Sequence, residues 1–271
     1  MEQTLQAKRK IMGAKRYVDL SIAIESGLPS DPPMLIPKID YVTHAQGAEQ
    51  MLQFFPGLKK EQLPGGLGWA IEHVSLTTHS GTHLDAPFHY HPTMDNGSKS
   101  ATIDEIPLDW CFNDGVVLDF RHKPDGALIS AADVKNELHR INYSIKPLDI
   151  VLVRTGADVA WGSGEYLVKG AGMGHDSTMY ILDQGVKVVG IDSWSWDRPL
   201  PFMARDFEKH GDPGVIWEAH FAGIQKGYYH MEKLANLGAI GKPYGFKVSC
   251  FPINIKGASA GWTRAVAIVE E

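Results

Sequence analysis

The thirteen residues 79–91, HSGTHLDAPFHYH, constrain this chain more than any other segment of its sequence. They contain four histidines and one aspartate. Imidazole nitrogens and carboxylate oxygens are the common non-thiolate ligands of zinc, and they also suit manganese and iron. Gly81 permits the tight turn that brings His79, His83 and Asp85 together. We therefore predict that these three side chains bind a divalent metal ion.

Other residues of this region have different expected roles. His89 lies four residues beyond Asp85, where an imidazole with its ordinary pKa of about 6.5 can pass a proton between water and a leaving group. Phe88 is expected to contact the substrate. His91 lies outside the compact part of the motif, so we expect it to be solvated or hydrogen-bonded elsewhere. His73, on the preceding strand, either points toward the site or has a structural role.

The predicted ligand set favours hydrolysis. A metal ion with an open position lowers the pKa of bound water toward about 7 and polarises a carbonyl group. The motif therefore predicts a hydrolase that attacks a small substrate with metal-bound hydroxide. Two other classes use the same ligands. One is a non-haem iron oxygenase with two histidines and a carboxylate. The other is a non-catalytic metal-binding protein, in which replacement of His89 leaves function unchanged.

The composition is that of a globular protein of 271 residues, with 44% apolar and 21% charged side chains. The net charge of −6 argues against nucleic acid as a partner. No segment has the apolar length of a signal peptide or of a membrane span, so we expect a soluble, cytoplasmic protein. Cys111 and Cys250 are expected to be buried thiols.

Apolar runs and turn signals predict an N-terminal arm (residues 1–16) followed by one α/β domain (17–271) with a mixed sheet. Strands are expected at 17–24, 70–78, 115–120, 149–155, 186–191, 247–255 and 262–269, the last two joined by the Gly-rich turn KGASAG. Helices are expected at 130–139, where Ser130 begins a capping box, at 178–184, which ends before Gly185, and at 215–227.

A Pro- and Gly-rich segment, residues 25–68, is expected to be a long loop that folds over the site. Aromatic side chains near the site are candidates to line a pocket for a flat or cyclic substrate, although core or subunit-interface positions explain them equally well. They are Trp194 and Trp196, which follow the strand at 186–191, and Trp69, Phe54 and Phe55.

A second group of polar residues lies in AHFAGIQKGYYHMEKLANL. His220 and Glu232 are twelve residues apart, and His230 lies between them. By itself this spacing is weak support for a metal site, because histidine and glutamate are also common on an exposed helix and its following loop.

The segment HSGTHLDAPFH matches every fixed position of HxGTHxDxPxH. It resembles the cyclase family of metal-dependent hydrolases, which contains bacterial kynurenine formamidase, isatin hydrolase and trans-dienelactone hydrolase. The resemblance extends to the GID segment at 190–192, the spacing of His220 and Glu232, the LANL segment at 234–237, and the terminal strand with Arg264. It covers most of the chain from Tyr17 onward.

This resemblance implies a swivelling β/β/α domain with a mixed central sheet, assembled as a homodimer or homotetramer. It implies that one or two Zn²⁺ or Mn²⁺ ions bind to each subunit, and that the substrate is a small linear or cyclic amide (an arylformamide, an isatin-like lactam or an imide) cleaved at its C–N bond. Lactone or ester hydrolysis is the alternative.

The implied ligands are His79, His83 and Asp85, with His220 and Glu232 added in the kynurenine formamidase branch, and His89 is the implied general acid/base. Isatin hydrolase-like members depart from this pattern at the Glu232 position. The two extra ligands argue against an oxygenase, since they fill positions that oxygen needs.

Overall fold

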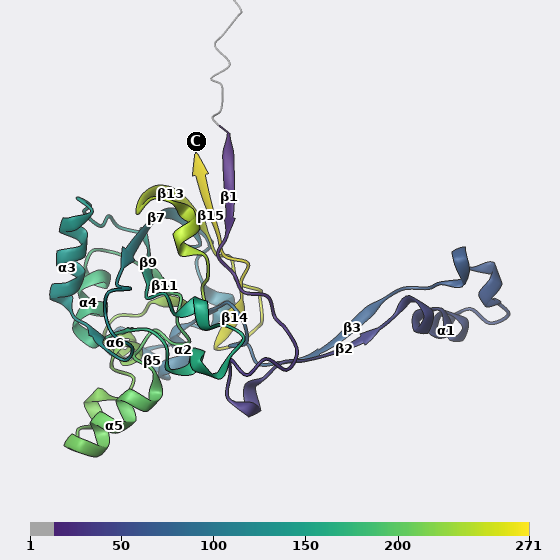
Figure 1. The fold of residues 1–271 in the computed structure, drawn as a ribbon, viewed down its shortest axis with the longest axis horizontal. Coiled ribbons are helices and arrows are strands. Elements are labelled where there is room, and N and C mark those ends of the chain that lie inside the picture. The colour runs from purple at the N-terminus through teal and green to yellow at the C-terminus, as the bar shows by residue number, and fades with distance from the viewer. Residues whose placement is uncertain (1–13, 271) are drawn as a thin grey trace, which may run out of the picture.

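A nine-stranded mixed sheet organises the computed structural model of this chain, which describes residues 14–270 (Figure 1). In spatial order its strands are β1 (Lys15–Asp19), β15 (Val266–Glu270), β13 (Tyr244–Ser249), β7 (Phe112–Asp119), β9 (Ile150–Arg154), β11 (Val188–Ile191), β12 (Tyr229–Glu232), β4 (His83–Asp85) and β14 (Ala260–Trp262). Strands β7, β9, β11 and β12 are parallel neighbours, and all other neighbouring pairs are antiparallel. The predicted α/β class with a mixed central sheet is confirmed.

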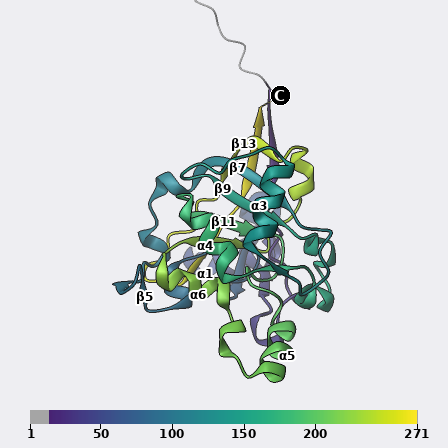
Figure 2. The same ribbon diagram turned by 90° about the vertical axis from the view of Figure 1, so that its left-hand side faces the viewer.

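The parallel centre of the sheet is buried on both faces, as its uninterrupted apolar runs predict. Val116 and Val151 point to one face, where they pack with buried side chains of the helices α3 (Ala131–Arg140) and α4 (His175–Asp183). Val117 and Ile150 point to the other face and pack with residues of β4, β12 and β13. The view in Figure 2 shows α3 and α4 in front of the central strands.

The helices predicted at 130–139, 178–184 and 215–227 form as α3, α4 and α6 (Glu218–Gln225). Ser130 caps α3 through a capping box with Asp133. Helix α4 ends at Asp183, and Gly185 has a φ of 89°. The remaining helices of residues 14–270 are α1 (His44–Phe54), α2 (Pro87–Tyr90) and α5 (Leu200–His210). None of the helices in this range is both long and apolar enough to cross a membrane.

A projecting hairpin, residues 38–75, replaces the loop predicted at 25–68, and that prediction was wrong. Strands β2 (Lys38–Val42) and β3 (Ile71–Ser75) pair antiparallel and carry α1 at their far end. Figure 1 shows this hairpin extending away from the sheet. Two further pairs of two-residue strands complete the fold: β5 (Thr93–Met94) with β6 (Ser98–Lys99), and β8 (Leu128–Ile129) with β10 (Gly172–Met173).

The N-terminal region also differs from the prediction. The first strand ends at Asp19 instead of residue 24, and it begins at Lys15, inside the predicted N-terminal arm. The rest of that arm, residues 1–13, lies outside the described residues. The strands predicted at 247–255 and 262–269 form in part as β13 and β15, which pair antiparallel on either side of the turn KGASAG. Between them the chain also forms β14, which pairs with β4 at the far edge of the sheet. Cys111 and Cys250 are buried free thiols, as predicted.

Candidate metal centre

Two antiparallel neighbours, β4 and β12, bring the polar residues together. In their register His230 lies opposite Asp85, and Glu232 lies opposite His83. His220 comes from α6, and His79 comes from the turn that precedes β4. That turn requires Gly81, whose φ is 65° and whose added Cβ would lie 2.8 Å from the Ile24 side chain. Long-range strand pairing therefore joins two segments that the sequence separates.

The first half of the cluster consists of His79, His83 and Asp85. His79 Nδ1 lies 2.8 Å and His83 Nε2 lies 3.3 Å from Asp85 Oδ1. The other nitrogen of each ring hydrogen-bonds to a group outside the cluster. His79 Nε2 bonds to Ser259 Oγ, and His83 Nδ1 bonds to the Gly81 carbonyl. Such outer contacts fix the ring so that its free nitrogen faces a metal.

The second half uses the other oxygen of Asp85. His230 Nε2 lies 2.8 Å from Asp85 Oδ2, and His220 Nε2 lies 3.6 Å from Glu232 Oε1. His220 Nδ1 hydrogen-bonds to the Asp197 carboxylate, which also accepts from the backbone amide of Ala219 at 2.8 Å. One potential ligand atom from each of Asp85, His220, His230 and Glu232 lies within 4.8 Å of the others.

Three atoms of this cluster are left without a hydrogen-bond partner among the described residues. They are His83 Nε2, Asp85 Oδ1 and His230 Nδ1, and all three side chains are completely buried. A buried polar atom without a hydrogen bond is costly, and most of all on a charged group. A divalent cation held by His83 Nε2 and Asp85 Oδ1 would satisfy both of these atoms, so the residues present fit a metal.

Electrostatics also favour the metal-binding form of the aspartate. Burial raises the pKa of Asp85, but the neighbouring His83, His79 and His89 together hold it well below its usual range. Asp85 is therefore an ionised carboxylate whose two oxygens each face one half of the cluster.

His89 lies at the same site on the short helix α2. Its ring centroid is 4.1 Å from that of His79 and 5.6 Å from that of His220. Burial lowers the pKa of His89 to about 3, with help from the surrounding histidines and against the Asp85 charge. The expectation of a pKa near its ordinary value was therefore wrong, and His89 is a neutral imidazole at neutral pH.

This pKa shift predicts how the stability of the metal-free protein depends on pH. The unfolded chain binds a proton at His89 below about pH 6.5, whereas the folded chain binds it only near pH 3, so stability falls as pH drops between these values. At pH 5 the loss is about 2 kcal/mol. Urea unfolding of chelator-treated protein at pH 7 and pH 5 should show this extra loss in the wild type and not in His89→Gln. Equal losses in the two proteins would contradict the shift.

The tryptophans predicted to line a pocket lie beside Glu232. Trp196 is completely buried, its indole donates to Thr178 Oγ1, and its backbone amide donates to Glu232 Oε1 at 2.8 Å. Its side chain thus forms core and its backbone positions the carboxylate. Trp194 donates to Asp31 Oδ1, and the ammonium group of the buried Lys233 lies over its ring.

The other predicted pocket residues are more exposed. Phe88 follows the cluster on α2 and has 43% of its surface exposed. Trp69 lies on the projecting hairpin, where its ring contacts Phe54 and its indole donates to Gln50. His73 is also exposed on that hairpin, in β3. His91 is hydrogen-bonded to Thr93, as expected of a residue outside the cluster.

Sequence reasoning missed two residues of the cluster. His230 was noted only for its position between His220 and Glu232, yet alternation along a strand places residues 230 and 232 on one face, and that parity could have identified it. The other is Asp197, which hydrogen-bonds to the backbone amide and the ring of His220. No sequence signal indicated this contact. Trp217, whose ring stacks on His220 at 4.5 Å, was also not predicted.

Both the sequence and the fold of this chain resemble those of known proteins. A family model described as "Putative cyclase" matches residues 18–198, more than half of the chain. No curated protein sequence matches it. Solved structures of similar fold include an isatin hydrolase bound to the product analogue thioisatinate (TM-score 0.73, 19% identity, covering 95% of this chain and 93% of that one). Isatin hydrolase A from Labrenzia aggregata bound to benzyl benzoate has a TM-score of 0.73 and 20% identity, covering 95% and 94%. A potential metal-dependent hydrolase with cyclase activity has a TM-score of 0.65 and 20% identity, covering 95% and 100%.

Proposed function

Because the chain belongs to the cyclase family, we propose that it is a metal-dependent hydrolase that cleaves the C–N bond of a small linear or cyclic amide. One observation carries this proposal: among the described residues His83 Nε2 and Asp85 Oδ1 are buried without a hydrogen-bond partner and lie 3.3 Å apart. The proposed ligands are His79, His83 and Asp85 for a first Zn²⁺ or Mn²⁺ ion. Asp85, His220, His230 and Glu232 are the proposed ligands for a second.

A divalent cation bound there supplies a water molecule of lowered pKa and an electrophile for a carbonyl oxygen. The chain's own residues supply the remaining functions. His89 lies beside His79, and its ring makes no hydrogen bond within residues 14–270, so it is placed to take a proton from water and return it to the leaving amine. Asp197 fixes the orientation of the His220 ring through Nδ1, and the Trp196 amide fixes Glu232.

The proposed substrate is an arylformamide, an isatin-like lactam or an imide. Exposed aromatic surface at the cluster supports a flat substrate: Phe88 is partly exposed, and Trp217 lies 5.4 Å from the His89 ring. The isatin hydrolases of similar fold support the cyclic amides. A lactone hydrolase remains the second candidate, because a bound cation polarises either carbonyl.

The test is elemental analysis of the purified protein combined with a turnover screen. We expect zinc or manganese at one or two ions per subunit, turnover of at least one of N-formylkynurenine, isatin or a dienelactone, and loss of turnover on chelation that is reversed by added metal. Turnover of the dienelactone alone would favour the lactone hydrolase. Turnover that survives complete metal removal, or oxygen consumption with ferrous iron and no hydrolysis, would refute the proposal.

A further inference from the structure

Lys233 is a charged side chain buried beside the candidate metal centre. It follows Glu232 directly in the chain, and only 2% of its surface is exposed. Transfer of an ammonium group from water into a protein interior is costly unless the charge is paired and its hydrogen bonds are made. The contacts of this ammonium group therefore show what the residue does.

The ammonium group of Lys233 has three partners. Its Nζ donates to Asp31 Oδ1 and, at 3.0 Å, to the backbone carbonyl of His79. It also lies over the Trp194 ring, 5.5 Å from the ring centroid, a distance at which a cation is attracted to an aromatic face. Three partners match the three N–H donors of an ammonium group, which leaves none for a substrate. The role of Lys233 is therefore to hold other groups in place.

Asp31, the carboxylate that pairs with Lys233, is itself held by its surroundings. It is 4% exposed, and its Oδ1 also accepts the indole N–H of Trp194 at 2.8 Å. The hydroxyl of the neighbouring Ser30 accepts from the Gly162 amide at 2.7 Å. The ion pair is thus anchored to segments of the chain that lie outside the metal cluster.

The backbone of Lys233 adopts a conformation that lysine rarely takes. Its φ is 57°, in the left-handed region where glycine or asparagine is the usual residue. In this conformation its amide donates to the Ser193 carbonyl at 3.0 Å, and its carbonyl accepts the Thr82 hydroxyl at 2.6 Å. Strained residues of this kind persist only where surrounding contacts hold them, and they cluster at functional sites. A lysine at such a position indicates that its side chain is used.

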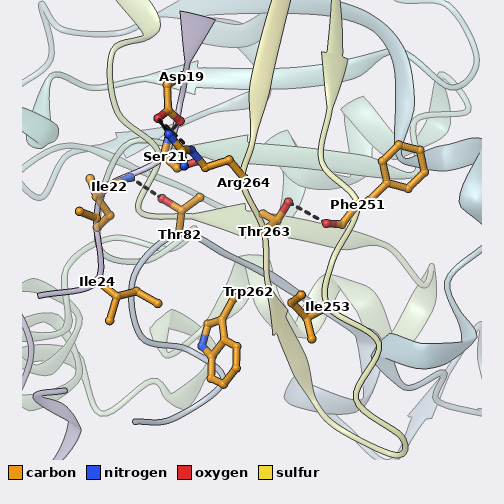
Figure 3. A pocket seen from close by; sticks show the side chains of 11 residues that line it. Asp19, Ser21, Ile22, Ile24, Thr82, Phe251, Ile253, Trp262, Thr263 and Arg264 are labelled. Carbon is orange, nitrogen blue, oxygen red and sulfur yellow. Dashed lines mark hydrogen bonds and ion pairs between the residues drawn. The ribbon is translucent and has the colours of Figure 1, made fainter. Parts of the chain in front are cut away.

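Thr82 provides a second link between Lys233 and the turn that carries the first half of the cluster. Its hydroxyl donates to the Lys233 carbonyl and accepts from the Ile22 amide at 2.9 Å, a bond that Figure 3 shows. Thr82 lies between His79 and His83, directly before the latter. Lys233 therefore bonds to this turn twice, through its ammonium group at His79 and through its carbonyl at Thr82.

We propose that Lys233 is a positioning residue that fixes His79 relative to Glu232, an inference that rests on the metal-dependent function proposed above. These two proposed ligands come from separate segments, the turn before β4 and the strand β12. Lys233 continues the backbone of Glu232 and bonds to the carbonyl of His79, so one residue connects the two halves of the cluster. Asp31 acts through Lys233 by keeping the ammonium group in place.

Stability of the fold does not by itself account for this arrangement. A buried ion pair repays little or none of the cost of removing two charges from water, and uncharged side chains of similar size are often as stable. An ion pair that only stabilised the fold could therefore be replaced by uncharged residues without loss. An ammonium group that positions a metal ligand through a hydrogen bond could not.

Zinc affinity, measured by competition with a chromophoric chelator, tests this role without any measurement of turnover. Lys233→Met keeps the length of the side chain and removes its donors. We expect it to bind Zn²⁺ about 10- to 100-fold more weakly than the wild type, the usual cost of losing a group that orients a metal ligand. Lys123→Met is the matched control, because it removes another mostly buried lysine, 18% exposed and paired with Asp133 at 2.8 Å. The control should keep the affinity of the wild type.

The double variant Asp31→Asn/Lys233→Met separates positioning from stability. Loss of Lys233 alone leaves a buried carboxylate unpaired and destabilises the fold, whereas removal of both charges relieves that penalty. Urea unfolding of the metal-free proteins should show the double variant to be more stable than Lys233→Met, while its Zn²⁺ affinity stays as low. Affinity that recovers together with stability would overturn the proposal, and so would wild-type affinity in Lys233→Met.

Failure of the proposed function would give a different result. A wild type that binds Zn²⁺ but hydrolyses none of the screened amides and lactones would refute the proposed hydrolysis, and the affinities of the variants would still decide the role of Lys233. A wild type without affinity for Zn²⁺ would overturn both proposals.

Discussion

Asp85→Asn is expected to remove the bound metal and to lower hydrolysis more than any other single substitution. Oδ1 of Asp85 faces His79 and His83, while Oδ2 faces His230. Asparagine keeps the shape of the side chain but loses the charge and one of the two acceptor oxygens. Both halves of the cluster therefore lose a ligand at once. Substitution of residues that merely orient metal ligands costs about 10- to 100-fold, so we expect a loss greater than about 100-fold here.

The measurement is metal content by elemental analysis together with turnover at saturating substrate. Asp109→Asn is the matched control, because it makes the same chemical change at an exposed aspartate. The control should keep its metal and its rate. If Asp85→Asn retained a full complement of metal and more than about a tenth of the rate, Asp85 would not be the shared ligand.

Part of the metal centre was predictable because its first half is local. His79, His83 and Asp85 fall within seven residues, and a turn at Gly81 is enough to bring them together. The central strands were predictable for a similar reason, since β7, β9 and β11 are short, apolar and bounded by turn residues.

The second half of the cluster depends on pairing between distant strands, which the sequence does not indicate. His230 and Glu232 reach Asp85 and His83 only because β12 lies beside β4, some 145 residues away in the chain. The Asp197–His220 contact depends on where α6 packs after the turn at Trp217, which has a positive φ of 53°. Neither the pairing of β12 with β4 nor the packing of α6 can be recognised from a periodic pattern in the sequence.

The hairpin was predicted only in part. Strand β3 lies within the strand expected at 70–78, whereas β2 and α1 lie in the segment that was expected to be a loop. Alternation of apolar and polar residues indicates a strand that buries one face in its own chain. In β2 both faces are largely exposed, and in its sequence, KIDYV, the adjacent apolar residues Tyr41 and Val42 break such an alternation.

His89→Gln is expected to separate catalysis from metal binding. Within residues 14–270 the ring of His89 makes no hydrogen bond to the protein, and it lies against His79, His220 and Trp217. Its nitrogens are therefore free to exchange a proton with water or substrate. Loss of a positioned acid/base group costs typically about 10²- to 10⁴-fold in rate, whereas glutamine preserves the polar volume and leaves the proposed ligands in place.

The decisive comparison is between turnover and metal content in the same preparation. His89→Gln should keep the metal stoichiometry of the wild type and lose most of its rate, while His91→Gln, the same exchange at a histidine bound to Thr93, should lose neither. A His89→Gln enzyme with full metal and full rate would remove the proton shuttle from the mechanism. Hydrolysis would then depend on the metal and its ligands alone.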